Sequence, residues 1–523
     1  MYPGTHALAS PDKPAVICPG SGETLSYRAL DDQSNRLAQL LHARGLRRGD
    51  HVALYCDNNA GFFVAVWACM RSGFYLTPIN WHLAPAEAAY IVDDCDATAL
   101  IASAAIPAAA ELGALVRDCP NKLAIGGEVP GFTRLETATA AMPARPLEKE
   151  WLGSLMGYSS GTTGKPKGIV RPLWDRGPEL GNPTLQSTAD IYEFGPDMVY
   201  LSPAPLYHAA PIAHTMATIQ AGGTVVAMER FEPEEALRLI ERYRITHSQW
   251  VPTMFIRLLK LPEAVRSRYD LSSQRHAVHA AAPCPVEVKR RMIDWWGPII
   301  DEYYSSTEAV AFTTITSEEW LAHPGSVGRN RGKPLHICDD DGNELPVGQP
   351  GQIYGEPMAG AAAFTYHKAA DKTGSSRNPL HPEWVSVGDV GYLDAEGYLY
   401  LTDRKSFMII SGGVNIYPQQ IEDALALHPK VGDVAVIGVP HPELGEEVKA
   451  IVEAAPGVEP SETLGEEIRA FVEARLGRQL TPRTVDFVDQ LPRLPTGKLY
   501  KKALRDRYWG TADGRTILAA QGS

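Results

Sequence analysis

The chain is poor in the features that mark disulfide-rich, zinc-ribbon and membrane-spanning proteins. Its 523 residues include only seven cysteines, none of them in a C-x-x-C pair, which excludes a disulfide framework and a zinc ribbon. No apolar run approaches the roughly 18 residues that a transmembrane helix needs. The first residues lack the basic and apolar regions of a secretory signal, and the last residues are no peroxisomal address. We therefore expect a cytoplasmic protein without stable membrane insertion.

Positive charge is also scarce. The chain has 49 Lys and Arg residues against 62 Asp and Glu residues, which gives a formal net charge of -13. Non-specific nucleic-acid binding requires clustered cations that displace phosphate counterions, so this balance argues against a nucleic-acid partner. Any polyanionic ligand must meet local cations against a negative background.

Helical and strand-like segments alternate in the first half of the chain. Residues 30–44 carry apolar residues at helical spacing, and a glycine-containing turn leads into the strand-like residues 51–55. The same order recurs in an apolar helix at residues 62–70 and a short strand at residues 74–79. A single core stops growing near about 250–300 residues, so a chain of this length needs more than one. The pattern predicts an α/β fold with a mostly parallel sheet.

The pattern changes after about residue 400. Residues 417–427 predict a helix, residues 433–439 a strand, and residues 463–476 a second helix that a capping box at Thr463 would open. These elements make a small α+β domain. We place the domain boundary in the charged stretch that begins at Asp403. The two predicted domains are residues 1–403 and residues 404–523.

A segment rich in glycine, hydroxyl and lysine side chains points to a phosphate ligand. Residues 158–168 read Tyr-Ser-Ser-Gly-Thr-Thr-Gly-Lys-Pro-Lys-Gly. Glycines let backbone amides approach an anion, hydroxyls donate to phosphate oxygens, and lysines supply charge. The spacing is not that of a Walker A motif, because two residues separate the first two glycines where that motif has four. The residues assigned to the phosphates are Ser159, Ser160, Gly161, Thr162, Thr163, Gly164, Lys165 and Lys167.

This segment resembles the signature phosphate loop of the adenylate-forming superfamily, which contains acyl-CoA synthetases, luciferases and the adenylation domains of peptide synthetases. Further signatures follow in the superfamily's order across about residues 150–500. The resemblance implies a large N-terminal α/β body with a small, mobile C-terminal α+β domain. It also implies ATP and Mg²⁺ as cofactors and CoA as a co-substrate, with Thr163 as one of the Mg²⁺ ligands.

A second segment, Tyr304-Ser305-Ser306-Thr307-Glu308, resembles the superfamily's Tyr-Gly-x-Thr-Glu element, with Ser305 in place of the glycine. A tyrosine face can stack on adenine, which is the role the resemblance implies for Tyr304. Thr307 would donate to the α-phosphate, and Glu308 would hold the Mg²⁺ that neutralises phosphate charge.

Residues on either side of the adenine complete this assignment. Glu302 could accept a hydrogen bond from the adenine amino group, and its neighbour Tyr303 is assigned to the same site. Ala281, Ala282 and Pro283 resemble the strip of small residues that lines the other adenine face, where the superfamily usually has glycines.

Two charged residues match the ribose-binding part of the superfamily. Residues 384–394 resemble its ribose-binding stretch, in which the Asp389 carboxylate would accept from both ribose hydroxyls. Arg404 matches the arginine that reaches the ribose. Near the end of the chain, Lys498 on a Pro/Gly turn would be a solvated surface charge if taken alone. In the superfamily pattern it bridges the substrate carboxylate and the α-phosphate as charge builds.

The resemblance implies a two-step reaction. A carboxylic acid first forms a mixed anhydride with AMP and releases pyrophosphate, because carboxylates do not react with thiols at neutral pH. The thiol of CoA then displaces AMP. Between these steps the small domain rotates about a hinge that falls on Ser406, and it brings Gly412 and Gly413 against the pantetheine channel. The implied activity is that of an AMP-forming, ATP-dependent carboxylic acid–CoA ligase.

The acid itself is less well defined. Residues 207–211 resemble the element that guards the acyl entrance, which gives His208 a role at the reacting acid, with simple packing as the alternative. Trp250 is left open between a core residue and a gate of the acyl pocket. No aspartate follows the aromatic position, where amino-acid-activating relatives hold an α-ammonium group. A fatty, aryl or alicyclic acid with an uncharged tail is therefore favoured.

Other functions stay open at this point. An adenylate-forming ligase or a luciferase-like enzyme would share every ATP residue but use a non-CoA acceptor. No carrier domain follows Lys498, which favours CoA as the acceptor. A nucleotide-binding module without catalysis would bind ATP but release no pyrophosphate with a carboxylate. A homodimer is among the assemblies that the sequence leaves open.

Overall fold

The computed structural model describes residues 2–159, 166–356, 364–404, 407–412, 414–493 and 499–509. It divides into two compact units. The first unit comprises Met1–Trp250, Pro262–Val278 and Gly360–Ser375, and the second comprises Val251–Leu261, His279–Ala359 and Ser376–Ser523. The predicted boundary between residues 403 and 404 lies within the second unit. The predicted site residues that lie outside the described ranges are Ser160, Gly161, Thr162, Thr163, Gly164, Lys165, Ser406, Gly413 and Lys498.

The first unit contains a six-stranded sheet in the order β7-β6-β5-β3-β4-β8, and every neighbouring pair in it is parallel. Its strands are β3 (His51–Tyr55), β4 (Tyr75–Pro78), β5 (Ala97–Ser103), β6 (Asn121–Ile125), β7 (Thr133–Arg134) and β8 (Ser154–Leu155). The helices of this part of the chain are α1 (Pro3–Ala9), α2 (Tyr27–Ala43), α3 (Ala60–Ser72), α4 (Pro85–Asp94), α5 (Ala109–Leu115) and α6 (Leu135–Thr139).

A second group of strands in this unit runs in the order β13-β11-β12-β1-β2, parallel except for the β1–β2 hairpin. Its strands are β1 (Pro14–Cys18), β2 (Glu23–Ser26), β11 (Val199–Ser202), β12 (Thr224–Ala227) and β13 (His247–Trp250). Its helices are α7 (Pro183–Ile191), α8 (Ala209–Ala221), α9 (Pro233–Tyr243) and α11 (Glu263–Arg266). The strand β14 (His276–His279) ends where the second unit resumes.

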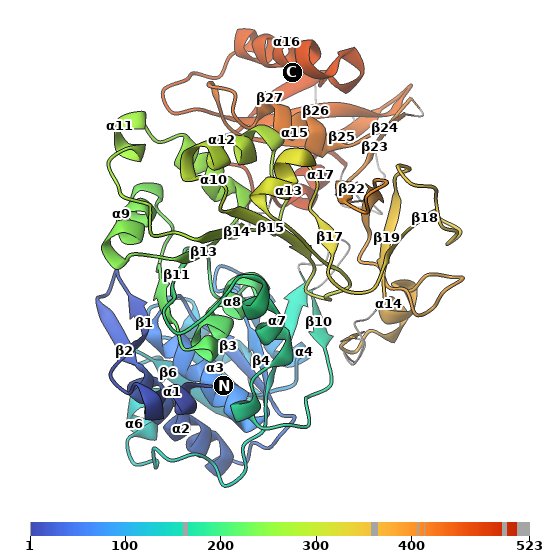
Figure 1. Ribbon diagram of the computed structural model, residues 1–523. Coiled ribbons are helices and arrows are strands. Elements are labelled where there is room, and N and C mark those ends of the chain that lie inside the picture. Colours follow the sequence, from blue (N-terminus) through green and yellow to red (C-terminus); the bar gives the residue numbers. More distant parts are fainter. Residues whose placement is uncertain are drawn as a thin grey trace. The chain divides into compact units, whose positions relative to one another are not determined.

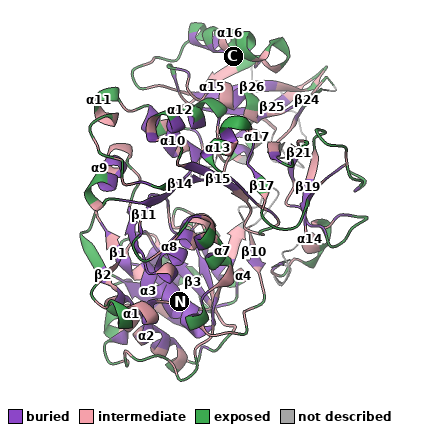
Figure 2. Ribbon diagram, viewed as in Figure 1, coloured by how far each residue is buried: buried purple, intermediate pink, exposed green. Residues whose placement is uncertain are grey.

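Helix α3 joins the two sheets of the first unit. It packs against β3 and β4 of one sheet and against β1 and β2 of the other, and Figure 2 draws it as buried. A helix that is apolar on all sides is expected to lie inside the protein, as this one does. The Asn59 side chain caps its start by accepting from the amide of Phe62, and Gly73 ends it at a φ of 70°.

A small three-stranded sheet, β20-β10-β9, completes the first unit. Its strands β9 (Gly157–Ser159), β10 (Lys167–Val170) and β20 (Thr365–Tyr366) are antiparallel, and helix α14 (Ala370–Ser375) follows β20. The strands β9 and β10 come directly before and after the predicted phosphate loop.

The second unit begins with antiparallel strands and the helices beside them. Strands β15 (Ile300–Ser305), β16 (Phe312–Ile315) and β17 (Arg329–Asn330) pair in that order. A four-stranded antiparallel sheet runs β18-β19-β21-β22, with strands β18 (Leu335–Cys338), β19 (Gly351–Gly355), β21 (Asp389–Leu393) and β22 (Leu399–Arg404). The helices are α10 (Pro252–Leu259), α12 (Val286–Trp296) and α13 (Ser317–Ala322).

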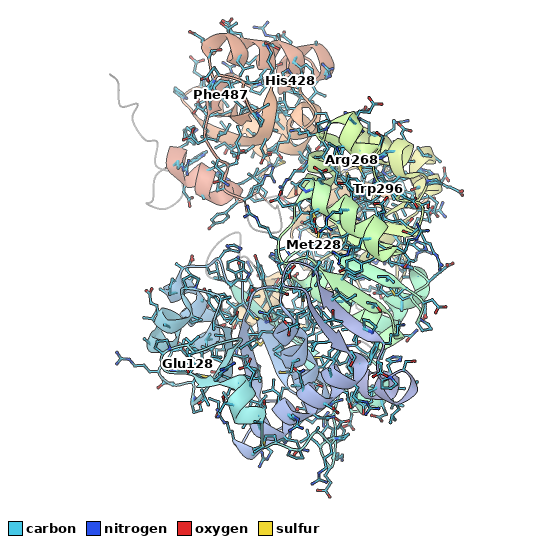
Figure 3. The ribbon with its side chains drawn as sticks, turned by 90° about the vertical axis from the view of Figure 1, so that its left-hand side faces the viewer. Glu128, Met228, Arg268, Trp296, His428 and Phe487 are labelled. Atoms are coloured by element: carbon cyan, nitrogen blue, oxygen red, sulfur yellow. The ribbon has the colours of Figure 1, made fainter. Side chains whose placement is uncertain are left out.

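The end of the chain folds around a sheet in the order β24-β23-β26-β25, with β27 parallel to β26 (Figure 1). Its strands are β23 (Ile409–Ser411), β24 (Val414–Ile416), β25 (Val431–His441), β26 (Gly445–Ala454) and β27 (Thr484–Phe487). Its helices are α15 (Pro418–Leu425), α16 (Glu462–Leu476) and α17 (Lys501–Trp509). Phe487 packs on the apolar core of this sheet, and His428 contacts Phe471 edge-on; Figure 3 labels Phe487 and His428.

The α/β class and the α+β character of the C-terminal segment are confirmed. The predicted strand at residues 51–55 is β3, and the predicted helix at residues 417–427 is α15. The capping box at Thr463 is wrong, because α16 begins at Glu462 and the side chain of Ser461 caps it by accepting from the amide of Leu464. Six of the seven cysteines are buried thiols. Within the described ranges, no helix has the length and apolar character to cross a membrane.

Candidate functional site

The predicted phosphate loop connects two antiparallel strands. In the β9–β10 ladder, Ser159 faces Lys167 and Tyr158 faces Gly168. A Walker A loop instead leads from a strand into a helix. The sequence-based exclusion of a Walker A motif is therefore confirmed by the topology on either side of the loop. The Tyr158 hydroxyl donates to Oδ2 of Asp94 at 2.6 Å, which anchors β9 beside α4.

Three residues predicted to bind the nucleoside meet in the second unit. Tyr304 lies near the end of β15, and its hydroxyl donates to Oδ2 of Asp389 at 2.7 Å. Asp389 opens β21 and is only 8% exposed, so its carboxylate is directed by protein contacts rather than by solvent. Arg404 ends β22 and stands opposite Asp389 in the antiparallel ladder. The fold thus gathers an aromatic ring, a carboxylate and an arginine backbone position from three separate strands.

The turn after β15 carries the other residues of the Tyr-x-x-Thr-Glu element. Ser305 donates from Oγ to the carbonyl oxygen of Ala311 at 2.8 Å, a bond that the glycine of the superfamily pattern could not make. Thr307 and Glu308 follow in this turn and are half-buried. The amide of Ala309 donates to the carbonyl of Ser306 at 2.9 Å and closes the turn.

Backbone strain marks two of the segments that the sequence assigned to the nucleotide, the strip of small residues and the turn that follows Glu308. Among the described residues of the second unit, only Ala281 and Ala309 are non-glycine residues with a positive φ, at 75° and 49°. An alanine in the left-handed region costs about 1–2 kcal/mol, and such strain gathers at functional sites. Gly355 lets β19 approach this turn, because a Cβ there would lie 2.1 Å from the carbonyl oxygen of Val310.

Glu302 lies in a buried ion pair that sequence reasoning missed. Its Oε2 accepts from Nζ of Lys289 at 2.7 Å and lies 3.3 Å from Nε2 of His279. These two neighbours hold the pKa of the Glu302 carboxyl down at about 2, against the opposing effect of burial. The sequence did contain a signal for this ion pair, because Lys289 falls on the apolar face of α12 together with the buried Val288 and Met292.

Tyr303 points to the other side of β15. It is 9% exposed, and its ring packs against Phe312 on β16 with the ring centroids 5.6 Å apart. Burial raises the pKa of its hydroxyl. Alternate side chains of a strand face opposite sides, which separates Tyr303 from Glu302 and Tyr304.

The carboxylates present suit Mg²⁺ held together with phosphate. Among the described residues, no group of three or more His, Cys, Asp and Glu side chains could hold a metal ion by itself. Mg²⁺ is ordinarily bound through one or two carboxylates, substrate phosphates and water. A single half-buried carboxylate such as Glu308 fits that mode of binding.

The first unit contains the residues that the sequence assigned to the acid. His208 precedes α8 as its N-cap residue, and its ring lies 4.4 Å from the ring of the buried Tyr207. Trp250 is fully buried, and its Nε1 donates to Oγ of Ser248 at 2.7 Å. Its ring also meets Phe231 edge-on. Trp250 is therefore a core residue in this structure.

Comparison with known proteins decides the family. The AMP-binding enzyme family matches residues 5–361, and the AMP-binding enzyme C-terminal domain matches residues 420–498. The chain belongs to the AMP-binding enzyme family. The predicted membership of the adenylate-forming superfamily is confirmed.

Relatives of this AMP-binding enzyme cover almost its whole length. It is 32% identical to a feruloyl-CoA synthase of Amycolatopsis sp., over 97% of this chain and 98% of the relative. It is 30% identical to the fatty acid–acyl-carrier-protein ligase ScoC of Streptomyces coeruleorubidus, over 97% and 95% of the two chains. The crystal structure of ATP-bound MatB from Rhodopseudomonas palustris is similar with a TM-score of 0.78 and 26% identity, over 97% and 99% of the chains.

The C-terminal segment of this AMP-binding enzyme carries the remaining predicted residues, of which the structure describes Gly412. Gly412 follows β23 at a φ of 57°, and its amide donates to the carbonyl of Leu444 at 2.9 Å. On either side of the segment with Lys498, Arg493 and Leu499 form an isolated antiparallel bridge. Arg493 is held in turn by a bidentate ion pair with Asp433.

Proposed function

We propose that this AMP-binding enzyme is an AMP-forming carboxylic acid–CoA ligase. It activates a carboxylic acid with ATP to an acyl-adenylate and pyrophosphate, and it then transfers the acyl group to CoA with release of AMP. The observation that carries the proposal is the pair Tyr304–Asp389, with Arg404 on the facing strand. An aromatic face beside a carboxylate is what a nucleoside requires, because the base stacks and the ribose hydroxyls donate.

The residues around the base, the ribose and the phosphates have the following roles in the adenylation step. The ring of Tyr304 stacks on adenine, with Ala281, Ala282 and Pro283 on the opposite face. Asp389 accepts from the ribose hydroxyls, and Arg404 lies on the adjoining strand. The amides, hydroxyls and lysines of residues 159–167 bind the β- and γ-phosphates. Thr307 donates to the α-phosphate.

Charge compensation completes the site. Glu308 and Thr163 would hold Mg²⁺, which would neutralise phosphate charge. Lys498 donates to the acid carboxylate and to the α-phosphate, where negative charge accumulates as the carboxylate oxygen attacks phosphorus. Electrostatic partners aimed at that developing charge usually contribute more to the rate of such reactions than any other effect. The C-terminal segment, residues 404–523, moves between the two steps in this proposal and presents Gly412 and Gly413 to the CoA arm.

The acid has an uncharged tail in this proposal and is fatty, aryl or alicyclic. His208 and the buried Tyr207 stand at the start of α8 and contact the acid. The relatives named above act on ferulate and on fatty acids, which are uncharged beyond the carboxylate. In the same proposal, the reaction takes place in the cytoplasm and the enzyme forms a homodimer. Light scattering on the purified protein tests the oligomeric state.

A second candidate acceptor is supported by one relative. The ligase ScoC is named for transfer to an acyl-carrier protein, although it matches 97% of this chain. Every ATP residue would serve either acceptor. The two functions differ only in the second step, where CoA or the phosphopantetheine of a carrier protein supplies the thiol.

Two assays test the proposal. Pyrophosphate release is measured with ATP and a panel of fatty, aryl and alicyclic acids, and an acid-dependent signal is expected for at least one of them. AMP release with that acid is then measured with and without CoA. Acceleration by CoA supports the ligase. If the adenylate forms but CoA never accelerates AMP release, the acyl acceptor is a carrier protein or another compound. Asp389→Asn serves as the inactive control.

A further inference from the structure

A buried ion pair, Lys289–Glu302, lies directly beside the candidate adenine site, and the His279 imidazole lies against it. These three residues are called the charged cluster below. Lys289 and His279 have no exposed side-chain surface, and Glu302 has only 5%. Lys289 also lies 5.0 Å from the centroid of the Trp320 ring, and His279 meets Phe255 edge-on at 5.4 Å. Aromatic side chains therefore pack against both Lys289 and His279.

The charged cluster joins the segments on both sides of the adenine. His279 immediately precedes residues 280–283, the strip of small residues. Lys289 stands on α12, the helix that follows this strip. Glu302 stands on β15 two residues before Tyr304, so the two side chains share one face of the strand. Fixing these three side chains fixes the strip relative to the tyrosine.

The energy of such a cluster does not explain its presence. Two charges that leave water lose several kcal/mol of solvation each, and their attraction often only offsets this loss. Well-packed apolar residues of the same volume are frequently as stable. A buried ion pair does restrict geometry, because a shift of either backbone leaves a buried charge unpaired.

We propose that Lys289 is a positioning residue for nucleotide recognition: its ion pair with Glu302 sets the distance between the 280–283 strip and Tyr304, and thereby the preference for adenine. Glu302 acts through this pair rather than by contact with the base. The inference rests on the proposed function, because it concerns the ATP site of that reaction. Its readout is the discrimination between ATP and inosine triphosphate, which carries a carbonyl where adenine has its amino group.

The test compares kcat/KM for ATP and for inosine triphosphate, measured by pyrophosphate release with one acid. The variants are Lys289→Met, Glu302→Gln and the double variant K289M/E302M. The double variant removes both charges together and retains the volume, so it is expected to fold even if the single variant does not. We expect the ratio of the two kcat/KM values to fall by about tenfold or more, since misplaced polar contacts weaken discrimination on this scale.

Two further quantities separate positioning from general loss of structure. A partly unfolded variant has fewer active molecules, which lowers both kcat/KM values equally and leaves their ratio unchanged. The KM of the acid is expected to stay within about threefold, because uniform binding of the other substrate is untouched. The control is Lys333→Met, which breaks a half-exposed pair with Glu356 at 2.6 Å in the same unit and should leave the ratio unchanged.

Three results would overturn the proposal or its basis, and they are distinguishable. If the folded double variant or the folded Glu302→Gln variant keeps the wild-type preference for ATP over inosine triphosphate, the ion pair has no positioning role. If Lys289→Met keeps the wild-type preference for ATP over inosine triphosphate and Glu302→Gln loses it, Glu302 contacts the base directly instead. Wild-type protein that releases no pyrophosphate with any acid contradicts the proposed function itself, before any variant is compared.

Discussion

The hydroxyl of Tyr304 donates to Oδ2 of Asp389 at 2.7 Å and joins two residues that are 85 positions apart in the sequence. The proposed stacking surface for the base and the proposed acceptor for the ribose are thus held as one piece. A substitution at either residue disturbs the position of the other. The proposed function therefore gives Tyr304 two roles that can be separated, one through its ring and one through its hydroxyl.

Tyr304→Phe should lower kcat/KM for ATP by about tenfold, because a hydrogen bond to a charged carboxylate contributes about 1.5–3 kcal/mol and orients Asp389. Tyr304→Ala should cost more, since the stacking ring is lost as well. The measurement is pyrophosphate release at varied ATP. The matched control is Tyr400→Phe on β22, in the sheet that contains Asp389, which removes the hydroxyl that donates to Asp394 at 3.3 Å. If the two Phe variants lower kcat/KM for ATP equally, the proposed role of the Tyr304 hydroxyl is wrong.

Lys498→Ala should suppress adenylation by at least about 10²-fold, the scale of losing one electrostatic partner of the transition state. A supplied acyl-adenylate should still react with CoA, because the second step does not use this lysine. The two half-reactions are measured separately, by pyrophosphate release and by thioester formation. The control is Lys430→Ala, a half-exposed lysine paired with Glu467 in the same segment. Equal loss of both half-reactions argues against the two-step movement of residues 404–523.

Ala281→Val should destabilise the protein by about 1 kcal/mol or more and raise the KM for ATP. A β-branched residue is strongly disfavoured at the φ of 75° that Ala281 adopts. Ala281→Gly should keep activity and leave stability equal or higher, since glycine adopts this φ without strain. Ala282→Val is the control for stability alone, because its backbone has no positive φ while its side chain belongs to the strip assigned to adenine. Thermal unfolding and ATP kinetics measure both effects, and equal destabilisation by the two Val variants would refute the role of strain.

The first unit should lose stability in mild acid through His214. This side chain is 4% exposed on α8, its Nδ1 lies 3.0 Å from the carbonyl oxygen of Ala210, and burial lowers its pKa from 6.5 to about 4. The folded pKa lies below the unfolded one, so the unfolded state binds the proton more tightly. Stability is then fully present above about pH 6.5 and falls as the pH drops toward 4.

Between pH 7.5 and pH 5, this group should remove about 2 kcal/mol of unfolding free energy. His214→Gln should make the urea midpoint correspondingly less dependent on pH. The control is His381→Gln, on an exposed side chain of the second unit. An unchanged pH dependence in the His214 variant would show that its burial does not govern acid stability.

Short-range features were predictable because they depend on neighbouring residues. The strand β3 and the helix α3 follow from apolar spacing within a few positions, and Pro418 at the start of α15 follows from its fixed φ. The capping residue was misplaced from Ser461 to Thr463, because the pattern fits either start and only the entry of the chain into the helix distinguishes them.

Sequence patterns alone were enough to predict the chemistry of this protein, from phosphate-binding residue types in an order that excludes Walker A and from a tyrosine and acidic residues for a nucleoside. The same patterns predicted the α/β fold. Three relationships could be found only in the folded chain: Tyr304 holds Asp389, Trp250 belongs to the core, and Lys289 is paired with Glu302 inside the protein. The reason is physical. Residue types and spacing act locally along the chain, whereas the burial of a charge and the partner of a hydroxyl depend on which distant strands the fold brings together.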